Sequence, residues 1–170
     1  MSRVFIRKPV EDDWEELLSI HQKSRELHFP WAFPALTKEE CQEYINQCEN
    51  DNFEGILICH SINKCIVGVA NLSQIFYKAF QNAYLGYYVN IEFAGQGFMA
   101  EGISLVINHA FYSLGLHRIE ANIQPGNIAS INLVNRLGFT KEGFSRRYLK
   151  INGEWRDHER WALTLEDWKA

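Results

Sequence analysis

The segment NIEFAGQGFMAEG, residues 90–102, carries glycines at a spacing that suits phosphate binding. Gly95, Gly97 and Ala100 form a G-x-G-x-x-A pattern between a run that predicts a strand and a run that predicts a helix. A loop without side chains lets an anion approach the free N–H groups at the helix start, where the helix dipole also favours negative charge. Glycines at such a junction are also a common turn requirement, so the pattern leaves both interpretations open.

A nicotinamide dinucleotide site is one alternative for this loop. It places a ribose-binding carboxylate about 20 positions further on, and Glu120 stands near that spacing. That fold repeats parallel βαβ units, whereas this sequence predicts one unit, at residues 83–124, with hairpin-like strands on either side. Glu120 also falls early in its predicted strand, while the ribose carboxylate belongs at a strand end. The dinucleotide interpretation is therefore disfavoured.

Hydrophobic periodicity predicts the elements that position the loop. Strands are expected at residues 3–7, 54–60, 65–73, 83–91 and 117–124, with a final pair around the tight-turn signal Asn152-Gly153. Helices are expected from Asp12 or Asp13 onward, at 38–50 behind the capping box Thr37-x-x-Glu40, at 98–114 before Gly115, and at 127–137 before Gly138. This order predicts an α+β fold with a mixed, mostly antiparallel central sheet, flanking helices and one parallel βαβ unit.

Composition limits the class of protein. The 170 residues are 46% apolar, which suits a single domain over residues 1–170. The cysteines contain no C-x-x-C pair, which favours the cytoplasm and predicts no metal site. No run approaches 18 uncharged apolar residues, so we expect neither signal peptide nor membrane span. The net charge of −4 argues against direct nucleic-acid binding.

Three stretches resemble the GNAT (Gcn5-related N-acetyltransferase) superfamily, and within it the ribosomal-protein alanine N-acetyltransferase (RimJ/RimL-like) branch. LGYYVNIEFAGQGFMAEG is similar to the strand, pyrophosphate loop and helix of that family, and IEANIQPGNIASINLVNRLGF to its next strand and helix. YLKINGEWRDHERWALTLEDW is similar to the C-terminal hairpin, and its N-G-x-W-R-D-H run is the most specific to the branch. The similarity extends over nearly the whole chain.

The resemblance implies acetyl-CoA as co-substrate, an amine acceptor, and a V-shaped opening between the strands at 83–91 and 117–124. It assigns the oxyanion donors to main-chain N–H groups around Val89 and Ile91. The residues it assigns to acetyl-CoA lie at the strand end, in the loop and in two helices: Val89, Ile91, Gly95, Gln96, Gly97, Phe98, Met99, Ala100, Asn127 and Asn132.

Two positions depart from the family pattern. Glu92 stands three residues before Gly95, where the family often has Gln or Arg, and a carboxylate there repels a pyrophosphate unless it points away. Val134 stands where many members have a tyrosine that protonates the leaving thiolate. The branch shares that replacement, and the resemblance gives the proton to Ser130 instead. As bare patterns, Asn127 and Ser130 also fit an ordinary helix N-cap and first turn.

The acceptor amine must lose a proton, and two residues are candidate bases. Glu120 could act directly or through water, or could be a strand residue paired with Arg118 or a C-terminal basic group. His158 is the rival base, although a strand histidine is more often packed or hydrogen-bonded. An α-amine, with a pKa of about 8, needs less help from a base than a lysine near 10.4.

Acceptor specificity is predicted to reside in HFPWAFPAL, residues 28–36, whose two prolines prevent a continuous helix. Its aromatic residues Phe29, Trp31 and Phe33 either cover the core or line the acceptor end, as the resemblance implies. Tyr88 and Tyr148 are expected to add hydroxyls, and His158 to contact the acceptor.

The leading expectation is acetyl-CoA-dependent N-acetylation of a protein α-amine, with a ribosomal protein as acceptor. The acidic excess of the first half favours a cationic acceptor, which a basic ribosomal N-terminus or a polyamine would satisfy equally. Small-molecule amines are therefore the nearest alternative, including polyamines, amino acids and antibiotics. A non-enzymatic acyl-CoA-binding module is the third, because Val134 removes the usual acid. Either a monomer or a homodimer fits the sequence.

Overall fold

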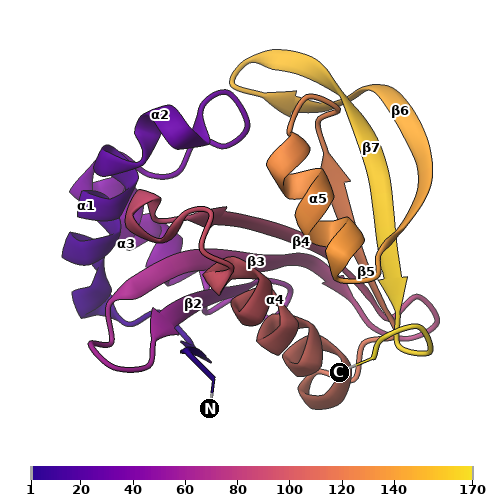
Figure 1. Cartoon of the computed structure of the whole chain (residues 1–170), viewed down its shortest axis with the longest axis horizontal. Helices are drawn as coiled ribbons and strands as arrows, with labels where there is room; N and C mark the ends of the chain where they lie inside the picture. Colours follow the sequence, from indigo (N-terminus) through magenta and orange to yellow (C-terminus); the bar gives the residue numbers. More distant parts are fainter. Residues whose placement is uncertain (1, 170) are drawn as a thin grey trace.

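The computed structural model describes residues 2–169, and one seven-stranded sheet runs through it in the order β1-β2-β3-β4-β5-β7-β6 (Figure 1). The β4–β5 pair is parallel and each other neighbouring pair is antiparallel. The strands are β1 Val4–Arg7, β2 Glu54–His60, β3 Ile66–Phe76, β4 Asn82–Val89, β5 Arg118–Ile123, β6 Thr140–Ile151 and β7 Glu154–Thr164. This topology confirms the predicted α+β class and its parallel βαβ unit.

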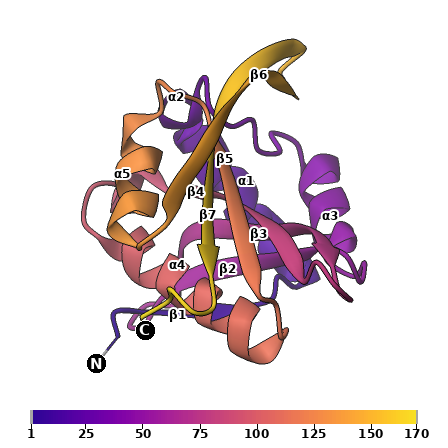
Figure 2. The same ribbon diagram turned by 90° about the vertical axis from the view of Figure 1, so that its right-hand side faces the viewer.

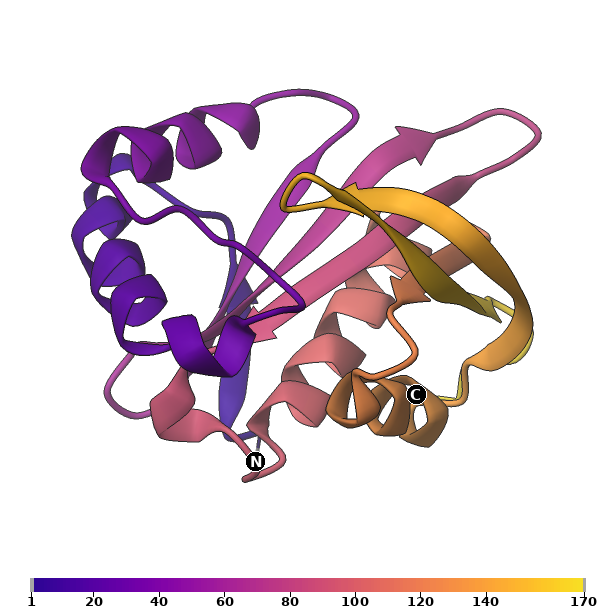
Figure 3. The ribbon, with the colours of Figure 1, turned by 90° about the horizontal axis from the view of Figure 1, so that it is seen from above.

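Helices cover both faces of the sheet (Figure 3). Their bounds are α1 Trp14–Lys23, α2 Arg25–His28, α3 Lys38–Gln47, α4 Phe98–Asn108 and α5 Ile128–Arg136, with 3₁₀ turns at Glu11–Asp13 and Ile91–Phe93 and a π turn at His109–Ser113. The first predicted helix is broken at Ser24, and the predicted 98–114 helix is α4 plus its π turn. Among residues 2–169, the helices are too short or too polar for a transmembrane span.

Two apolar clusters fix the helices on the sheet. Leu17 of α1 and Cys41 of α3 pack with Leu57 of β2 on one face, while Ile103 of α4 packs with Ile58 of β2 on the other. Successive residues of β2 thus enter opposite clusters, which explains why EGILICH is a continuous apolar run. Complete burial of one such side chain contributes about 1.5–3 kcal/mol.

The sheet opens in the middle, between β4 and β5. The two strands pair only from Asn82 to Tyr84, opposite Arg118 to Glu120. Beyond that point β4 stays paired with β3 as far as Val89, and β5 stays paired with β7. Figures 1 and 2 show the two strands at an angle, with α5 following β5. This divergence matches the predicted V-shaped opening.

Local signals in the sequence account for two further features. The Thr37 Oγ1 accepts from the Glu40 N–H at 3.2 Å, which confirms the predicted cap of α3. The reciprocal bond of the box is shifted, because the Glu40 carboxylate accepts from the Leu36 N–H. Asn152 and Gly153 have φ of 47° and 83°, as the tight turn between β6 and β7 requires.

Candidate active site

The glycine loop ends at the N-terminus of α4 in a conformation that suits glycine. Gly95 has φ of +72° and Gly97 has φ of +81°, a region that side-chain-bearing residues rarely adopt. Gly97 is the N-cap of α4, and no side chain of the described residues caps that helix end. The first-turn N–H groups of α4 are therefore open to an anion, as the phosphate interpretation requires.

The N-terminal segment holds this loop from behind. The Arg3 guanidinium pairs with the Glu101 carboxylate, donates to the Gln96 carbonyl at 3.3 Å, and lies 4.2 Å from the centre of the Phe98 ring. The Gln96 side chain donates to the Glu92 carbonyl, and Phe98 is only 8% exposed, within the apolar core. Gln96 and Phe98, both predicted to contact acetyl-CoA, thus fix the shape of the loop and line no cavity described below.

The residues at 91 and 92 are turned away from the loop. The Glu92 carboxylate lies 3.7 Å from the Lys23 ammonium and is exposed, so it does not oppose a bound anion. The Ile91 N–H donates to Ser24 Oγ at 3.0 Å and its side chain is 45% exposed. The prediction that the Ile91 N–H serves as a second oxyanion donor is therefore corrected, since that N–H already has a partner.

A cavity of about 390 Å³, here called the loop cavity, lies between the glycine loop, the end of β4 and α5. It brings together most residues predicted for acetyl-CoA: Val89, Gly95, Gly97, Met99, Ala100, Asn127 and Asn132, together with Ser130. Arg136 also lines it, although it is not among the residues that the resemblance assigns to acetyl-CoA, and a cation on this wall complements a phosphate-bearing ligand.

The main-chain groups of Val89 face the loop cavity side of β4. The Asn90 N–H donates to the Val67 carbonyl of β3 at 2.8 Å. Because neighbouring strand residues direct their main-chain groups to opposite sides, Val89 turns its groups away from β3. Its carbonyl accepts from His28 Nε2 at 2.7 Å, which assigns the ring proton to Nε2. Burial lowers the pKa of His28, so the ring is neutral at pH 7.

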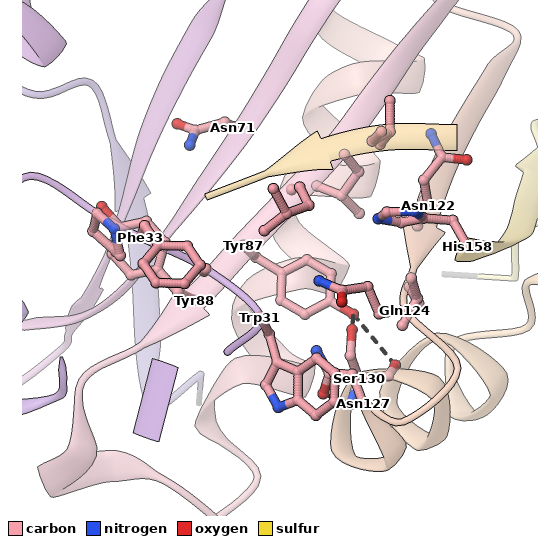
Figure 4. Close-up of a pocket in the computed structure, with 18 of the residues that line it drawn as sticks. Trp31, Phe33, Asn71, Tyr87, Tyr88, Asn122, Gln124, Asn127, Ser130 and His158 are labelled. Carbon is pink, nitrogen blue, oxygen red and sulfur yellow. Dashed lines mark hydrogen bonds between the residues drawn. The ribbon is translucent and has the colours of Figure 1, made fainter. Parts of the chain in front are cut away.

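Tyr87 and Ser130 form a hydroxyl pair where β4 meets α5. Their oxygens lie 2.6 Å apart, and the Ser130 N–H donates to the Asn127 side-chain oxygen at 3.3 Å (Figure 4). Asn127 is thus the N-cap of α5, as the interpretation of an ordinary helix N-cap predicts. Burial raises the pKa of Tyr87 to about 12. Val134, which replaces the usual tyrosine, is completely buried in the core.

A second cavity of about 460 Å³, the inner cavity, lies on the other side of this pair. Its walls come from the 31–35 segment, β4, β5 and the β6–β7 hairpin (Figure 4). Among residues 2–169, no Asp, Glu, Lys or Arg side chain lines it. Its polar groups are amides, hydroxyls and imidazoles: Asn71, Asn122, Gln124, Asn127, Tyr44, Tyr87, Tyr88, Ser130, His21 and His158.

Tyr88 is half-buried in the wall of this cavity and its hydroxyl is already engaged. The His21 Nδ1 contacts the Ala35 carbonyl at 2.7 Å, so Nδ1 carries the proton. The Tyr88 hydroxyl then donates to His21 Nε2 at 2.8 Å. Burial lowers the pKa of His21 to about 4 and raises that of Tyr88. The pair therefore adds no charge at neutral pH.

The loop cavity and the inner cavity meet at a few shared residues: Trp31, Ala32, Tyr87, Tyr88, Asn127 and Ser130. A ligand in one cavity can thus reach a ligand in the other at the Tyr87–Ser130 pair. Trp31 crosses the opening, and its ring is so close to Gly126 that a Cβ there would lie 2.8 Å away. A side chain at Gly126 would displace the Trp31 ring.

The two predicted bases differ in placement. His158 is buried, lines the inner cavity, and donates from Nδ1 to the Arg156 carbonyl at 2.9 Å, so Nε2 keeps its lone pair. Burial lowers its pKa. Glu120 lines neither cavity, because its carboxylate accepts from Arg118 Nε at 2.8 Å on β5. The alternative of a paired strand residue therefore describes Glu120 better than the direct-base assignment.

The aromatic residues predicted for the acceptor end are distributed unevenly. Trp31 and Phe33 line the inner cavity, whereas Phe29 does not. Phe29 and Phe33 are 62% and 47% exposed, so these two side chains do not cover the core, whereas Ala35 of the same segment packs against it. Tyr148 lines neither cavity, and its ring centre lies 6.3 Å from that of His158.

Known proteins share both sequence and fold with this chain. Residues 3–140 match the acetyltransferase (GNAT) domain family. The ribosomal protein uS5-alanine N-acetyltransferase of Escherichia coli (strain K12) is 44% identical over 98% of this chain and 90% of its own. A spermidine N(1)-acetyltransferase of Vibrio cholerae is 23% identical over 94% of this chain and 91% of its own. The structure of Mycobacterium smegmatis RimJ in complex with CoA-disulfide matches with a TM-score of 0.87 and 25% identity over 96% of this chain and 82% of that chain.

Proposed function

Because this chain belongs to the GNAT acetyltransferase family, we propose that it acetylates the N-terminal α-amine of a protein, and that a ribosomal protein is the acceptor. Members of the family are N-acetyltransferases that use acetyl-CoA. The whole described chain acts as one domain in this proposal, since β6 and β7 continue the sheet from β5. Its cytoplasmic location and its state as a monomer or homodimer stay predictions.

The loop cavity fits coenzyme A by its own features. Gly95 and Gly97 leave space beside the uncapped N–H groups of α4, and Arg136 adds a cation. Acetyl-CoA, when bound, supplies the acetyl group as a thioester. The Val89 N–H supports the negative charge that develops on a carbonyl oxygen, and the Tyr87–Ser130 pair holds a proton for the leaving sulfur.

The inner cavity supports an α-amine acceptor, and its lack of charge carries this proposal. A cavity without carboxylates disfavours an ammonium ion, because burial penalises the charged form. An α-amine with a pKa of about 8 becomes neutral at a lower cost than an amine near 10.4. Polyamines keep further positive charges that need carboxylate partners. The Escherichia coli relative named for uS5-alanine acetylation supports the same acceptor class.

A direct assay tests the proposal. The protein is incubated with acetyl-CoA and one acceptor at a time, namely alaninamide, a ribosomal N-terminal peptide starting with alanine, or spermidine, and free thiol is followed. We expect acetylation of the alanine acceptors at rates well above that of spermidine. Preferential use of spermidine would support the polyamine alternative. If none of the acceptors raises the rate of thiol release above that without enzyme, the acyl-CoA-binding module would be favoured.

The pH dependence should follow the acceptor rather than His158. Burial lowers the pKa of His158, so its neutral, basic form persists below the usual 6.5. The limb of the pH–rate profile that His158 controls therefore lies at acid pH. We expect kcat/KM for an alanine peptide to rise up to about pH 8, the α-amine pKa. An acceptor amine of lower pKa should move this limb down with it. A limb fixed at one pH for all acceptors would contradict the expectation.

A further inference from the structure

The end of β4 and the turn after it, residues 89–91, are held from two directions. On one side, Asn90 donates from its main-chain N–H to the Val67 carbonyl at 2.8 Å and from its side chain to the Ile66 carbonyl at 3.0 Å, both next to or on β3. On the other side lies α2 (Figure 3), which bonds to the residues that flank Asn90. This segment includes the Val89 N–H, the proposed oxyanion donor.

Ser24 and His28 provide the contacts on the α2 side. They lie one helical turn apart, and the His28 N–H donates to the Ser24 carbonyl at 2.9 Å. Ser24 Oγ accepts from the Ile91 N–H at 3.0 Å. His28 donates from Nε2 to the Val89 carbonyl at 2.7 Å. Ser24 is completely buried and His28 is 5% exposed, so both side chains are shielded from competing water.

Histidine is an energetically unfavourable side chain at position 28. Its Nδ1 is buried and has no hydrogen-bond partner among residues 2–169. A buried polar atom without a partner opposes folding. An apolar side chain of similar size would pack beside Tyr88, whose ring centre lies 5.1 Å from that of His28, without this penalty. The presence of His28 is therefore explained by the bond from Nε2 rather than by stability.

That bond fixes the main chain of Val89. Tyr88 and Asn90 direct their main-chain groups to β3, whereas Val89 directs its N–H and its carbonyl into the opening of the sheet. No strand pairs with Val89 there, since β5 is paired with β4 only from Asn82 to Tyr84. The bond from His28 takes the place of a strand partner for this carbonyl. With the carbonyl held, the chain at Val89 resists rotation and its N–H keeps one direction.

We propose that His28 is a positioning residue for acetyl transfer, which holds the Val89 carbonyl so that the Val89 N–H points at the oxygen of the acetyl group. Ser24 supports it by holding the Ile91 N–H on the far side of the turn. The inference rests on the Val89 N–H as oxyanion donor under the proposed function. A misdirected donor weakens the transition state far more than the bound ground state, so kcat should fall while coenzyme A affinity is kept.

Two variants at position 28 test this role with the acceptor that the wild-type protein uses best. His28→Leu removes the donor, whereas His28→Gln keeps an amide N–H about as far from the backbone as Nε2. We expect kcat to fall about tenfold in His28→Leu, less than the loss of about 10²–10³-fold when an oxyanion donor is removed outright. His28→Gln should recover most of the rate. Wild-type kcat in a folded His28→Leu variant, or no recovery in His28→Gln, would overturn the proposal.

Asn82→Leu is the matched control. Asn82 lies at the opposite end of β4, is completely buried, and lacks partners for both polar atoms of its side chain within the described part of the chain. The change thus removes the same kind of unpartnered atom from the same strand, away from Val89. We expect it to leave kcat at the wild-type value. A loss equal to that of His28→Leu would show a general loosening of β4 and would contradict a positioning role.

Infrared spectroscopy reports on the donor without any acceptor. A hydrogen bond from the Val89 N–H lowers the carbonyl stretching frequency of bound, isotope-labelled acetyl-CoA. We expect a higher frequency in His28→Leu than in the wild type, and a return toward the wild-type value in His28→Gln. Ser24→Ala, a smaller change, should shift the frequency in the same direction as His28→Leu and serves if that variant does not fold.

The infrared result separates the two proposals. An identical frequency in the wild type and in every folded variant would overturn the role of His28. A wrong acceptor assignment leaves the frequency shift in place, because no amine is present in this measurement, and shows itself as alanine acceptors that the wild-type protein does not acetylate.

Discussion

Replacing Gly97 by valine is expected to raise the dissociation constant of coenzyme A by about 100-fold, the equivalent of 2.8 kcal/mol. The physical reason is twofold. Gly97 has φ of +81°, which a β-branched residue adopts only with strain of about 1–3 kcal/mol. The new Cβ would also stand 3.4 Å from Arg3 Nη2, so the side chain would disturb the guanidinium that holds the loop in shape through the Gln96 carbonyl. Calorimetric titration with coenzyme A measures the change directly.

A matched control separates strain from ligand binding. Gly115 lies beyond the other end of the same helix, has φ of +70°, and has no atom within 4 Å of where a Cβ would stand. Gly115→Val therefore introduces similar backbone strain away from the loop cavity. We expect it to lower stability while the coenzyme A affinity stays at the wild-type value. Unchanged affinity in a folded Gly97→Val variant would rule out phosphate binding by this loop.

The second large effect is expected at the hydroxyl pair. Ser130→Ala should lower kcat by about 10²–10⁴-fold, the range of general acid catalysis, and leave coenzyme A affinity nearly unchanged. Tyr87→Phe removes the other hydroxyl of the 2.6 Å contact and should act on the same step. The double variant should therefore be little worse than the stronger single variant, because both residues serve one proton transfer.

The chemistry of the leaving group provides the decisive comparison. An acetyl donor whose leaving group is an acidic aryl thiol releases a stable thiolate that needs no proton. Both variants should therefore approach the wild-type rate with this donor. Ser104→Ala is the control, because Ser104 sits on α4, donates to the Ala100 carbonyl and lines no described cavity. If Ser130→Ala slows both donors equally, or neither, Ser130 is only a first-turn residue of α5.

The sequence predicts the fold well because its signals are local. Apolar alternation, Thr37 at a helix start and Asn152-Gly153 at a turn each act within a few residues, and the structure has an element or turn at each. The break at Ser24 escaped prediction, because helical periodicity runs through it. The end of β4 was also set two residues too far, since the Ile91 N–H turns to Ser24, which lies 67 positions earlier.

The site was predictable only where main-chain geometry follows from a motif. The glycine loop and the Asn127 cap stand where the patterns put them. Tyr87 was missed because its partner Ser130 lies 43 positions away, and nothing in the sequence reports that distance. The same holds for His28, which bonds to the Val89 carbonyl across 61 positions. Glu120 illustrates the reverse problem: a carboxylate with chemical capacity is already neutralised by Arg118, two residues before it on the same strand face.

The short seam between β4 and β5 also affects how the sheet moves. Three residue pairs join these strands, against seven for β3–β4 and six for β5–β7. A small rotation about this seam widens or narrows the opening while the longer ladders stay intact, so the sheet is hinged at its centre. Local opening free energies follow the number of backbone bonds that must break. The amide of Ala83, which faces β5, should therefore exchange with deuterium faster than those of Val69 and Ala121.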